Sequence, residues 1–162
     1  MTEVEIKNEV ERQFNILKRG CEELINEEEF KKKLERSIRT GKGLKVKFGI
    51  DPTGSDLHLG HAVPIRKLKQ FQDLGHEPIF LIGTFTARIG DPTGKSETRK
   101  MLSMEQIEKN IKTYMDQISL ILDINKMTVK YNHEWLETLD LTTILNLLSK
   151  FTVSQMISRE DF

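Results

Sequence analysis

Apolar and polar positions in the N-terminal part of the chain repeat with the period of an α-helix. Apolar side chains recur every three or four positions at Ile6, Val10, Phe14 and Leu17. Gly20 then ends the run, so an amphipathic helix is predicted before it. A second helix is predicted from Asn26, because Glu29 stands three positions later, as a capping box requires. We expect residues 1–43 to form a helical arm whose charged side is exposed to water.

From Leu44 onward the pattern alternates between short apolar runs and helical stripes. Three runs are predicted to be strands, namely Leu44–Ile50, Pro78–Gly83 and Thr128–Tyr131. The second run is apolar throughout, which is typical of a buried parallel strand. Amphipathic helices are predicted between and after these runs, and Asp140 caps the last of them. The alternation predicts an α/β fold with a doubly wound parallel sheet over residues 44–162, in which ligands bind beyond the carboxyl ends of the strands.

The composition narrows the class of protein. Over 162 positions, 25 Lys and Arg residues balance 25 Asp and Glu residues, so no general basic surface for nucleic acid is expected. Cys21 is the single cysteine, which excludes an internal disulfide. The acidic N-terminus lacks the apolar segment of a signal peptide, and no apolar run approaches the roughly 20 residues that cross a bilayer. We therefore expect a cytoplasmic protein without a membrane partner.

The turn after the first predicted strand contains the first candidate chemistry. The strand ends at Gly49-Ile-Asp51, a Pro-Thr-Gly turn follows, and a helix is predicted to open near His58. This geometry presents backbone N–H groups and a positive dipole end to a phosphate. His58 and His61 project from the first helical turn, with Gly60 between them leaving room for a flat group to approach. A histidine pair alone is more often structural, but this context favours a nucleotide site.

A metal site is disfavoured at the same place. His76 and His133 lack metal-ligand spacing, and no cysteine lies near the pair.

A second motif, Gly90-Asp-Pro-Thr-Gly94-Lys95-Ser, resembles a phosphate-binding P-loop without matching it. A P-loop needs four residues between its glycines, and here there are three. The helix that should follow the lysine is also missing from the pattern, so a P-loop phosphotransferase is disfavoured. Gly94, Lys95 and Arg99 could still clamp phosphate oxygens. The alternative is a solvated basic loop.

Taken together, these motifs resemble the class I aminoacyl-tRNA synthetases, in the form of the bacterial tyrosyl-tRNA synthetases. Residues 48–61, FGIDPTGSDLHLGH, are similar to the HIGH signature of that class. Further similar blocks follow in order at residues 71–76, 82–96, 131–135 and 151–159. The resemblance covers essentially the whole chain and implies a Rossmann-like, HUP-type fold of which only the first half is present. Tryptophanyl-tRNA synthetases share the fold, but the Gly90–Lys95 block favours tyrosine.

The resemblance implies a reaction in which ATP and tyrosine form tyrosyl-adenylate and pyrophosphate, followed by transfer of tyrosine to tRNA-Tyr. Groups that would hold ATP are Gly49, Asp51, Pro52 and Gly60. Groups with catalytic roles would be Thr53, His58, His61, Lys95 and Arg99. Tyrosine would be bound by Thr86, Asp91, Asn132 and Trp135, although a tryptophan taken alone is typical of a core or interface residue. Mg²⁺ would accompany ATP, with no protein-bound metal and no tightly bound cofactor.

Within these sets, the resemblance implies more specific roles. Thr53 and His58 would contact the γ-phosphate, and His61 would contact the ribose. Asp91 would bind the tyrosine ammonium, while Lys95 and Arg99 would close over pyrophosphate.

The first predicted strand departs from the common family pattern. Many members carry a Tyr-Cys pair there, and the tyrosine contacts the substrate phenol. This chain has Lys47 and Phe48 instead, as a subgroup of the family does, so recognition of the phenol must differ.

The length of the chain also departs from the family. The chain ends at Phe162, and the resemblance implies further parts: the second half of the nucleotide-binding fold, a KMSKS loop and a tRNA-binding domain. We expect the 162-residue chain alone to be marginally stable and at best feebly active, and we expect the full-length protein to be a homodimer. The alternatives are a non-catalytic nucleotide-binding remnant and a tryptophan-specific relative.

Overall fold

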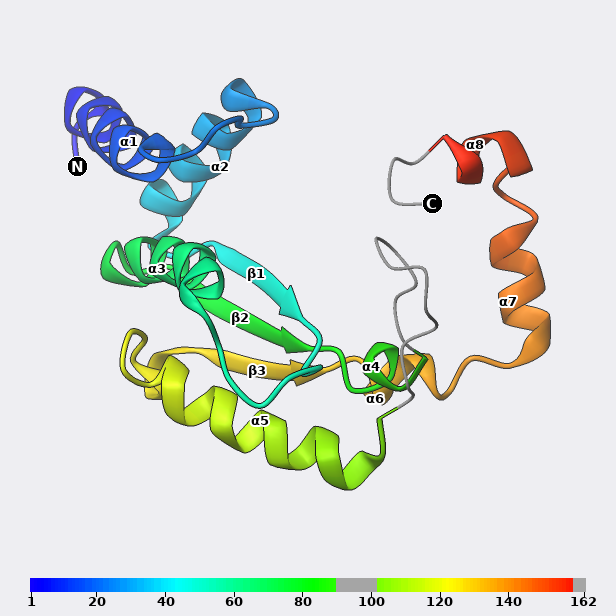
Figure 1. The fold of residues 1–162 in the computed structure, drawn as a ribbon. Helices are drawn as coiled ribbons and strands as arrows, with labels where there is room; N and C mark the ends of the chain where they lie inside the picture. The colour runs from blue at the N-terminus through cyan, green and yellow to red at the C-terminus, as the bar shows by residue number, and fades with distance from the viewer. Residues whose placement is uncertain (90–101, 159–162) are drawn as a thin grey trace.

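The sheet has three parallel strands in the order β1-β2-β3. The computed structural model describes residues 1–89 and 102–158. The strands are β1 (Lys45–Ile50), β2 (Glu77–Ile82) and β3 (Thr128–Tyr131). Ile50 is in register with Ile82, and Ile82 with Tyr131, so all three strands end at one edge (Figure 1). The predicted strands and the parallel α/β fold are thus confirmed, with bounds shifted by a residue or less.

Helices connect the strands and extend the chain at both ends. The helices are α1 (Glu3–Lys18), α2 (Glu27–Thr40), α3 (Leu59–Asp73), α4 (Thr86–Ile89), α5 (Met104–Ile118), α6 (His133–Leu136), α7 (Leu141–Leu148) and α8 (Val153–Ile157), with a short 3-10 helix at Ile124–Lys126. Within the described residues, none of these helices is both long and apolar enough to cross a membrane.

Helices α3 and α5 cover one face of the sheet. Their buried residues Ile65, Leu68, Tyr114 and Ile118 form one core cluster with Phe80 and Ile82 of β2. Both crossovers run in the same direction across the sheet, and right-handed crossovers then place both helices on the same side. The other face carries the exposed β1 positions Lys45, Lys47 and Gly49. The described chain therefore forms one half of a doubly wound arrangement.

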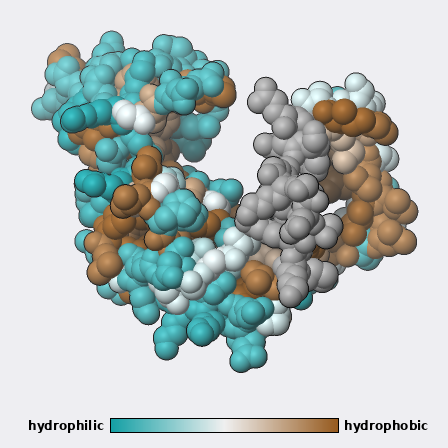
Figure 2. All heavy atoms as spheres, viewed as in Figure 1, coloured by the Kyte–Doolittle hydropathy of each residue, from teal (hydrophilic) through white to brown (hydrophobic). Residues whose placement is uncertain are grey.

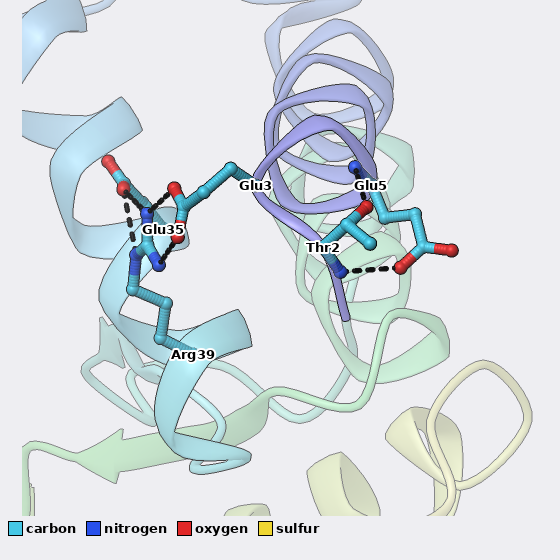
Figure 3. A network of polar contacts seen from close by, with 5 residues as sticks. All are labelled: Thr2, Glu3, Glu5, Glu35 and Arg39. Atoms are coloured by element: carbon cyan, nitrogen blue, oxygen red, sulfur yellow. Dashed lines mark hydrogen bonds and ion pairs between the residues drawn. The ribbon is translucent and has the colours of Figure 1, made fainter.

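The N-terminal helices α1 and α2 pack on α3. Phe14, Leu17 and Leu34 are buried in a second cluster, which also takes in Phe71 of α3. At the surface the guanidinium of Arg39 donates to both carboxylate oxygens of Glu3, at 2.7 and 2.6 Å, and also to Glu35 (Figure 3). These exposed ion pairs connect α1 to α2 but contribute little to stability.

Helices α7 and α8 stand apart from the sheet (Figure 1). Every residue of these two helices is exposed, and their apolar side chains form a continuous hydrophobic surface at the right of Figure 2. The exposed members include Leu141, Leu145, Leu147, Phe151, Val153 and Ile157. The amphipathic pattern that predicted a helix after Asp140 is therefore present, but its apolar side has no cover among the described residues.

Candidate active site

His58 and His61 close the N-terminus of α3 through a reciprocal cap. Nδ1 of His58 accepts from the backbone N–H of Gly60 at 3.1 Å, and Nδ1 of His61 accepts from the backbone N–H of His58 at 3.2 Å. The two rings stack with their centroids 3.8 Å apart and their planes 26° apart. The pair thus uses the box arrangement of helix capping, with imidazoles in place of the usual hydroxyl and carboxylate.

This cap determines which nitrogens can bind a ligand. A ring nitrogen that accepts a hydrogen bond carries no proton, so the neutral forms of His58 and His61 carry theirs on Nε2. Neither Nε2 makes a hydrogen bond within the described residues. The site therefore presents two N–H donors on stacked imidazoles, which suits anionic oxygens.

The same cap changes the role expected for the backbone of α3. Free backbone N–H groups were predicted to meet a phosphate here. The N–H of Gly60 is instead taken by the His58 ring, and those of His61 and Ala62 bond to the His58 carbonyl at 2.9 and 3.3 Å. This expectation was wrong for those three N–H groups, because the cap residue already satisfies them, whereas the N–H of Leu59 has no partner among the described residues. The imidazoles therefore supply most of the available donors at this helix start.

Burial lowers the pKa of His61, and the adjacent His58 ring, when charged, lowers that pKa further. Two stacked imidazoles cannot both be charged without repulsion. His61 is therefore neutral at physiological pH, and its Nδ1 remains available as the acceptor that completes the cap.

Gly60 makes room for the His58 ring. A Cβ atom at position 60 would lie 2.8 Å from Cε1 and 2.9 Å from Nδ1 of His58. Any other residue would push the ring away from its cap position. The structure thus gives Gly60 a local steric role, in addition to the adenine contact that the resemblance implies.

Asp51, Thr86 and Asn132 form a hydrogen-bonded chain across the carboxyl ends of the strands. The Thr86 hydroxyl donates to Oδ1 of Asp51 at 2.7 Å and accepts from the Asn132 amide at 3.0 Å. Oδ1 of Asn132 accepts from the backbone N–H of Phe85 at 2.7 Å, which fixes the orientation of the amide. Each residue follows a different strand, so the parallel register brings together positions that lie far apart in the sequence.

Gly83 and Thr84 support this chain and were not singled out from the sequence. A Cβ atom at Gly83 would lie 1.7 Å from Oδ1 of Asp51 and 2.4 Å from the Thr86 hydroxyl, so only glycine fits beneath that pair. The buried Thr84 hydroxyl lies 2.6 Å from Nδ1 of His133. The available signal was a Gly-Thr pair directly after a buried strand, at the edge where ligands bind.

The remaining residues of the turn after β1 lie in three different environments. Pro52 is fully buried, so its ring is part of the core and not a ligand surface. Thr53 is half-buried, and its backbone N–H donates to the Asp51 carbonyl at 2.8 Å. Gly49 is exposed on the open face, where the Lys47 side chain folds over it and would reach within 3.0 Å of an added Cβ.

Phe48 faces the opposite side of the sheet from Lys47. It packs against the core, with its ring 5.8 Å from that of Phe80. Lys47 therefore lies on the open face of the sheet, where its side chain can reach a ligand.

Trp135 is not part of this network. Trp135 lies on α6 and is 42% exposed, and its side chain makes no hydrogen bond among the described residues. Gly94, Asp91, Lys95 and Arg99 lie outside the described residues.

Comparison with known proteins identifies the family. The sequence model described as tRNA synthetases class I (W and Y) matches residues 39–162. The tyrosine–tRNA ligase of Carboxydothermus hydrogenoformans is 54% identical over 155 residues, covering 96% of this chain and 38% of that relative. The tyrosine–tRNA ligase of Desulfotalea psychrophila is 54% identical over 153 residues, with 94% and 38% coverage.

A solved structure supports the fold. Tyrosyl-tRNA synthetase complexed with L-tyrosine from Archaeoglobus fulgidus has a TM-score of 0.67 at 22% identity, and the match covers 88% of this chain and 41% of that one. The chain thus spans about 38% of the length of these two curated relatives. Because the family model covers the sheet, the histidine pair and the Asp51–Thr86–Asn132 chain together, the chain belongs to the class I tRNA synthetases of the tryptophan and tyrosine type.

Proposed function

We propose that this chain carries the ATP-binding part, and a portion of the tyrosine-binding part, of a tyrosine–tRNA ligase. The observation that carries the proposal is the reciprocal cap of His58 and His61, which leaves two Nε2–H donors beside the carboxyl ends of the strands. The identity of 54% to named tyrosine–tRNA ligases supports tyrosine over tryptophan. The activity, the substrates and the partners of the whole protein are part of this proposal.

Formation of tyrosyl-adenylate requires hydrogen-bond donors to the phosphates and does not require a general base. The attacking tyrosine carboxylate is already ionised at neutral pH. Negative charge grows on the phosphate oxygens as pyrophosphate departs, and fixed N–H donors stabilise that charge. In this proposal His58 and Thr53 contact the γ-phosphate and His61 contacts the ribose. Mg²⁺ enters with ATP, held mainly by phosphate oxygens and water.

Tyrosine lies on the open face of the sheet in this proposal. The chain of Asp51, Thr86 and Asn132 borders the amino-acid end, and Trp135 closes the pocket from α6. Asp91 binds the ammonium group. Lys95 and Arg99 contact pyrophosphate, and Lys47 approaches the phenol because its side chain lies over Gly49.

The wider setting is also proposed from the family. The activated tyrosine passes to tRNA-Tyr, and the working protein is a cytoplasmic homodimer. Residues 1–43 act as a helical arm attached to the half-fold of residues 44–162.

A chimera tests the activity. This chain replaces the corresponding 38% of the Carboxydothermus hydrogenoformans ligase, and tyrosine-dependent exchange of pyrophosphate into ATP is measured. We expect exchange with tyrosine and not with tryptophan. His58→Asn keeps an N-cap and removes the Nε2 donor, so exchange should fall by about two orders of magnitude. Exchange with tryptophan alone would overturn the substrate assignment, and an inactive chimera that binds ATP would favour a non-catalytic nucleotide-binding protein.

A further inference from the structure

Three polar side chains of α5 hold the turn that leads from β1 to α3. Asn110, Tyr114 and Gln117 stand at positions i, i+4 and i+7, so they share one side of the helix. The turn runs down from the tip of β1 to that side of α5 before it rises to α3 (Figure 1). α5 therefore both covers the sheet and contacts the turn that carries the candidate phosphate-binding residues.

The contacts fall next to those residues. The amide of Asn110 donates to the Pro52 carbonyl at 2.9 Å, one residue before Thr53. Oε1 of Gln117 accepts from the backbone N–H of Leu57 at 2.8 Å, one residue before His58. These two contacts hold the turn at both of its ends.

Two further contacts secure the middle of the turn. Nε2 of Gln117 donates to Oδ1 of Asp56 at 3.1 Å. Tyr114 is only 2% exposed and belongs to the core cluster, and its hydroxyl lies 4.0 Å from the position that a Cβ atom would take at Gly54. Burial raises the pKa of this phenol. Tyr114 thus anchors the turn to the hydrophobic core.

The turn has little structure of its own. Among the described residues, one backbone–backbone hydrogen bond lies within residues 51–57, from Thr53 N–H to the Asp51 carbonyl. A segment with so few internal bonds takes its shape from what it rests on. Here it rests on α5. The hydrogen bonds from α5 go to Pro52, Asp56 and Leu57, and not to Thr53 or the histidines that would face the ligand.

We propose that Asn110 and Gln117 are positioning residues, which set the turn so that Thr53 and the Nε2–H donors of His58 and His61 meet the phosphates of ATP. This inference rests on the proposed function and assigns to α5 a role beyond packing. A misplacement of a donor by about 1 Å can cost roughly a hundredfold in rate, so loss of either contact should be felt in turnover.

The test uses Gln117→Met, which keeps length and packing but removes both polar contacts. Asn110→Ser is the second variant, and Lys112→Met on the exposed side of α5 is the matched control. In the active chimera we expect Gln117→Met to lower kcat for pyrophosphate exchange by about tenfold to a hundredfold while KM for tyrosine stays unchanged. Lys112→Met, which changes an exposed side chain of α5, should match the wild type.

A second measurement is independent of activity. Nitrogen chemical shifts of the histidine side chains in this 162-residue chain report which ring nitrogen carries the proton. We expect the Nδ1 acceptor signals of His58 and His61 to weaken in Gln117→Met and to persist in Lys112→Met.

The outcomes separate the two proposals. If the wild-type chimera shows no pyrophosphate exchange, the proposed function is rejected. The nitrogen chemical shifts of the histidines then still test whether Asn110 and Gln117 position the turn. Unchanged kcat and unchanged shifts in both Gln117→Met and Asn110→Ser overturn the inference. If Gln117→Met fails to fold, Asn110→Ser is compared with Lys112→Met instead. The inference is then tested by kcat for pyrophosphate exchange and by the histidine nitrogen shifts of these two variants.

Discussion

The backbone N–H of Leu44 donates a hydrogen bond of 3.1 Å to Nδ1 of His76. This bond lies where the helical arm enters β1, and His76 is only 5% exposed. The imidazole packs against Phe71, with ring centroids 5.8 Å apart, and its Nε2 has no partner among the described residues. A buried neutral histidine therefore holds the start of the first strand.

The stability of the protein should fall in mild acid because of this histidine. Burial lowers the pKa of His76 below its usual 6.5. Between the two values the unfolded chain binds more protons than the folded one, so stability is full above about pH 6.5 and is lost as pH falls through the folded value. Protonation also places a proton on Nδ1, opposite the Leu44 N–H.

Urea unfolding of the wild type and His76→Asn between pH 7.5 and pH 5 tests this prediction. Asparagine supplies an oxygen near the position of Nδ1 and does not titrate, so the variant should lose less stability in acid. His61, whose pKa burial also lowers, is present in both proteins, so its contribution cancels in the comparison. Parallel curves for the two proteins would show that His76 is not the acid-sensitive group.

The fold could be predicted further from the sequence than the site could. Thr128–Tyr131 was predicted with the bounds that the structure has, because strand and helix periods are local properties. Asn132 stands at the N-cap position of α6. No side-chain cap bond forms, since its amide reaches back across the sheet to Thr86 instead. The contact between Asn132 and Thr86 depends on the register of β2 and β3, and the local sequence pattern does not determine that register.

Gly60→Ala should weaken nucleotide binding without unfolding the protein. The new methyl group would displace the His58 ring, and the hydrogen bond that caps α3 would be lost. Replacing glycine by alanine within a helix has the opposite effect, because it stabilises the helix by roughly 0.5–1 kcal/mol. The net change in unfolding free energy should be small. ATP affinity should fall by about tenfold, as expected for the loss of one charge-assisted hydrogen bond.

A double-mutant cycle identifies the cause. In a His58→Asn background the side chain at position 58 is shorter, so adding Gly60→Ala should change ATP affinity little in titration calorimetry. An equal effect of Gly60→Ala in both backgrounds would mean that the methyl group does not act through the His58 ring.

Gly83→Ala should be among the more destabilising single substitutions in the sheet region. Its methyl group would occupy the space of the Asp51 carboxylate, which combines overpacking with loss of the Thr86 bond. We expect a loss of at least about 2 kcal/mol in unfolding free energy.

Thr86→Val is the matched comparison for Gly83→Ala. It removes the hydroxyl without crowding and should cost about 1–2 kcal/mol. Urea midpoints that rank Thr86→Val below Gly83→Ala in stability would contradict the close approach of Asp51 to Gly83.

Lys67 attaches the arm to the sheet domain by closing the C-terminus of α1. From α3, its ammonium donates to the carbonyls of Leu17 and Arg19 at 2.9 and 2.7 Å, and to Gln70 at 2.7 Å. Carbonyls at the end of a helix have no partner within it, and a cation there also interacts favourably with the helix dipole. One side chain thus satisfies two carbonyl groups from another element.

Lys67→Met should therefore loosen α1 while the sheet stays intact. Methionine keeps much of the apolar stem but leaves both carbonyls without their donor, at a cost of about 1–2 kcal/mol. Hydrogen exchange should accelerate in α1 and α2 and remain slow in β2, whose Phe80 and Ile82 are fully buried. Lys69→Met is the control, because among the residues that the structure describes Lys69 pairs only with Asp73 of the same helix, and such exposed ion pairs contribute little. Equal exchange in α1 for the two variants would mean that the apolar cluster around Phe14 and Leu17 holds the arm without help from Lys67.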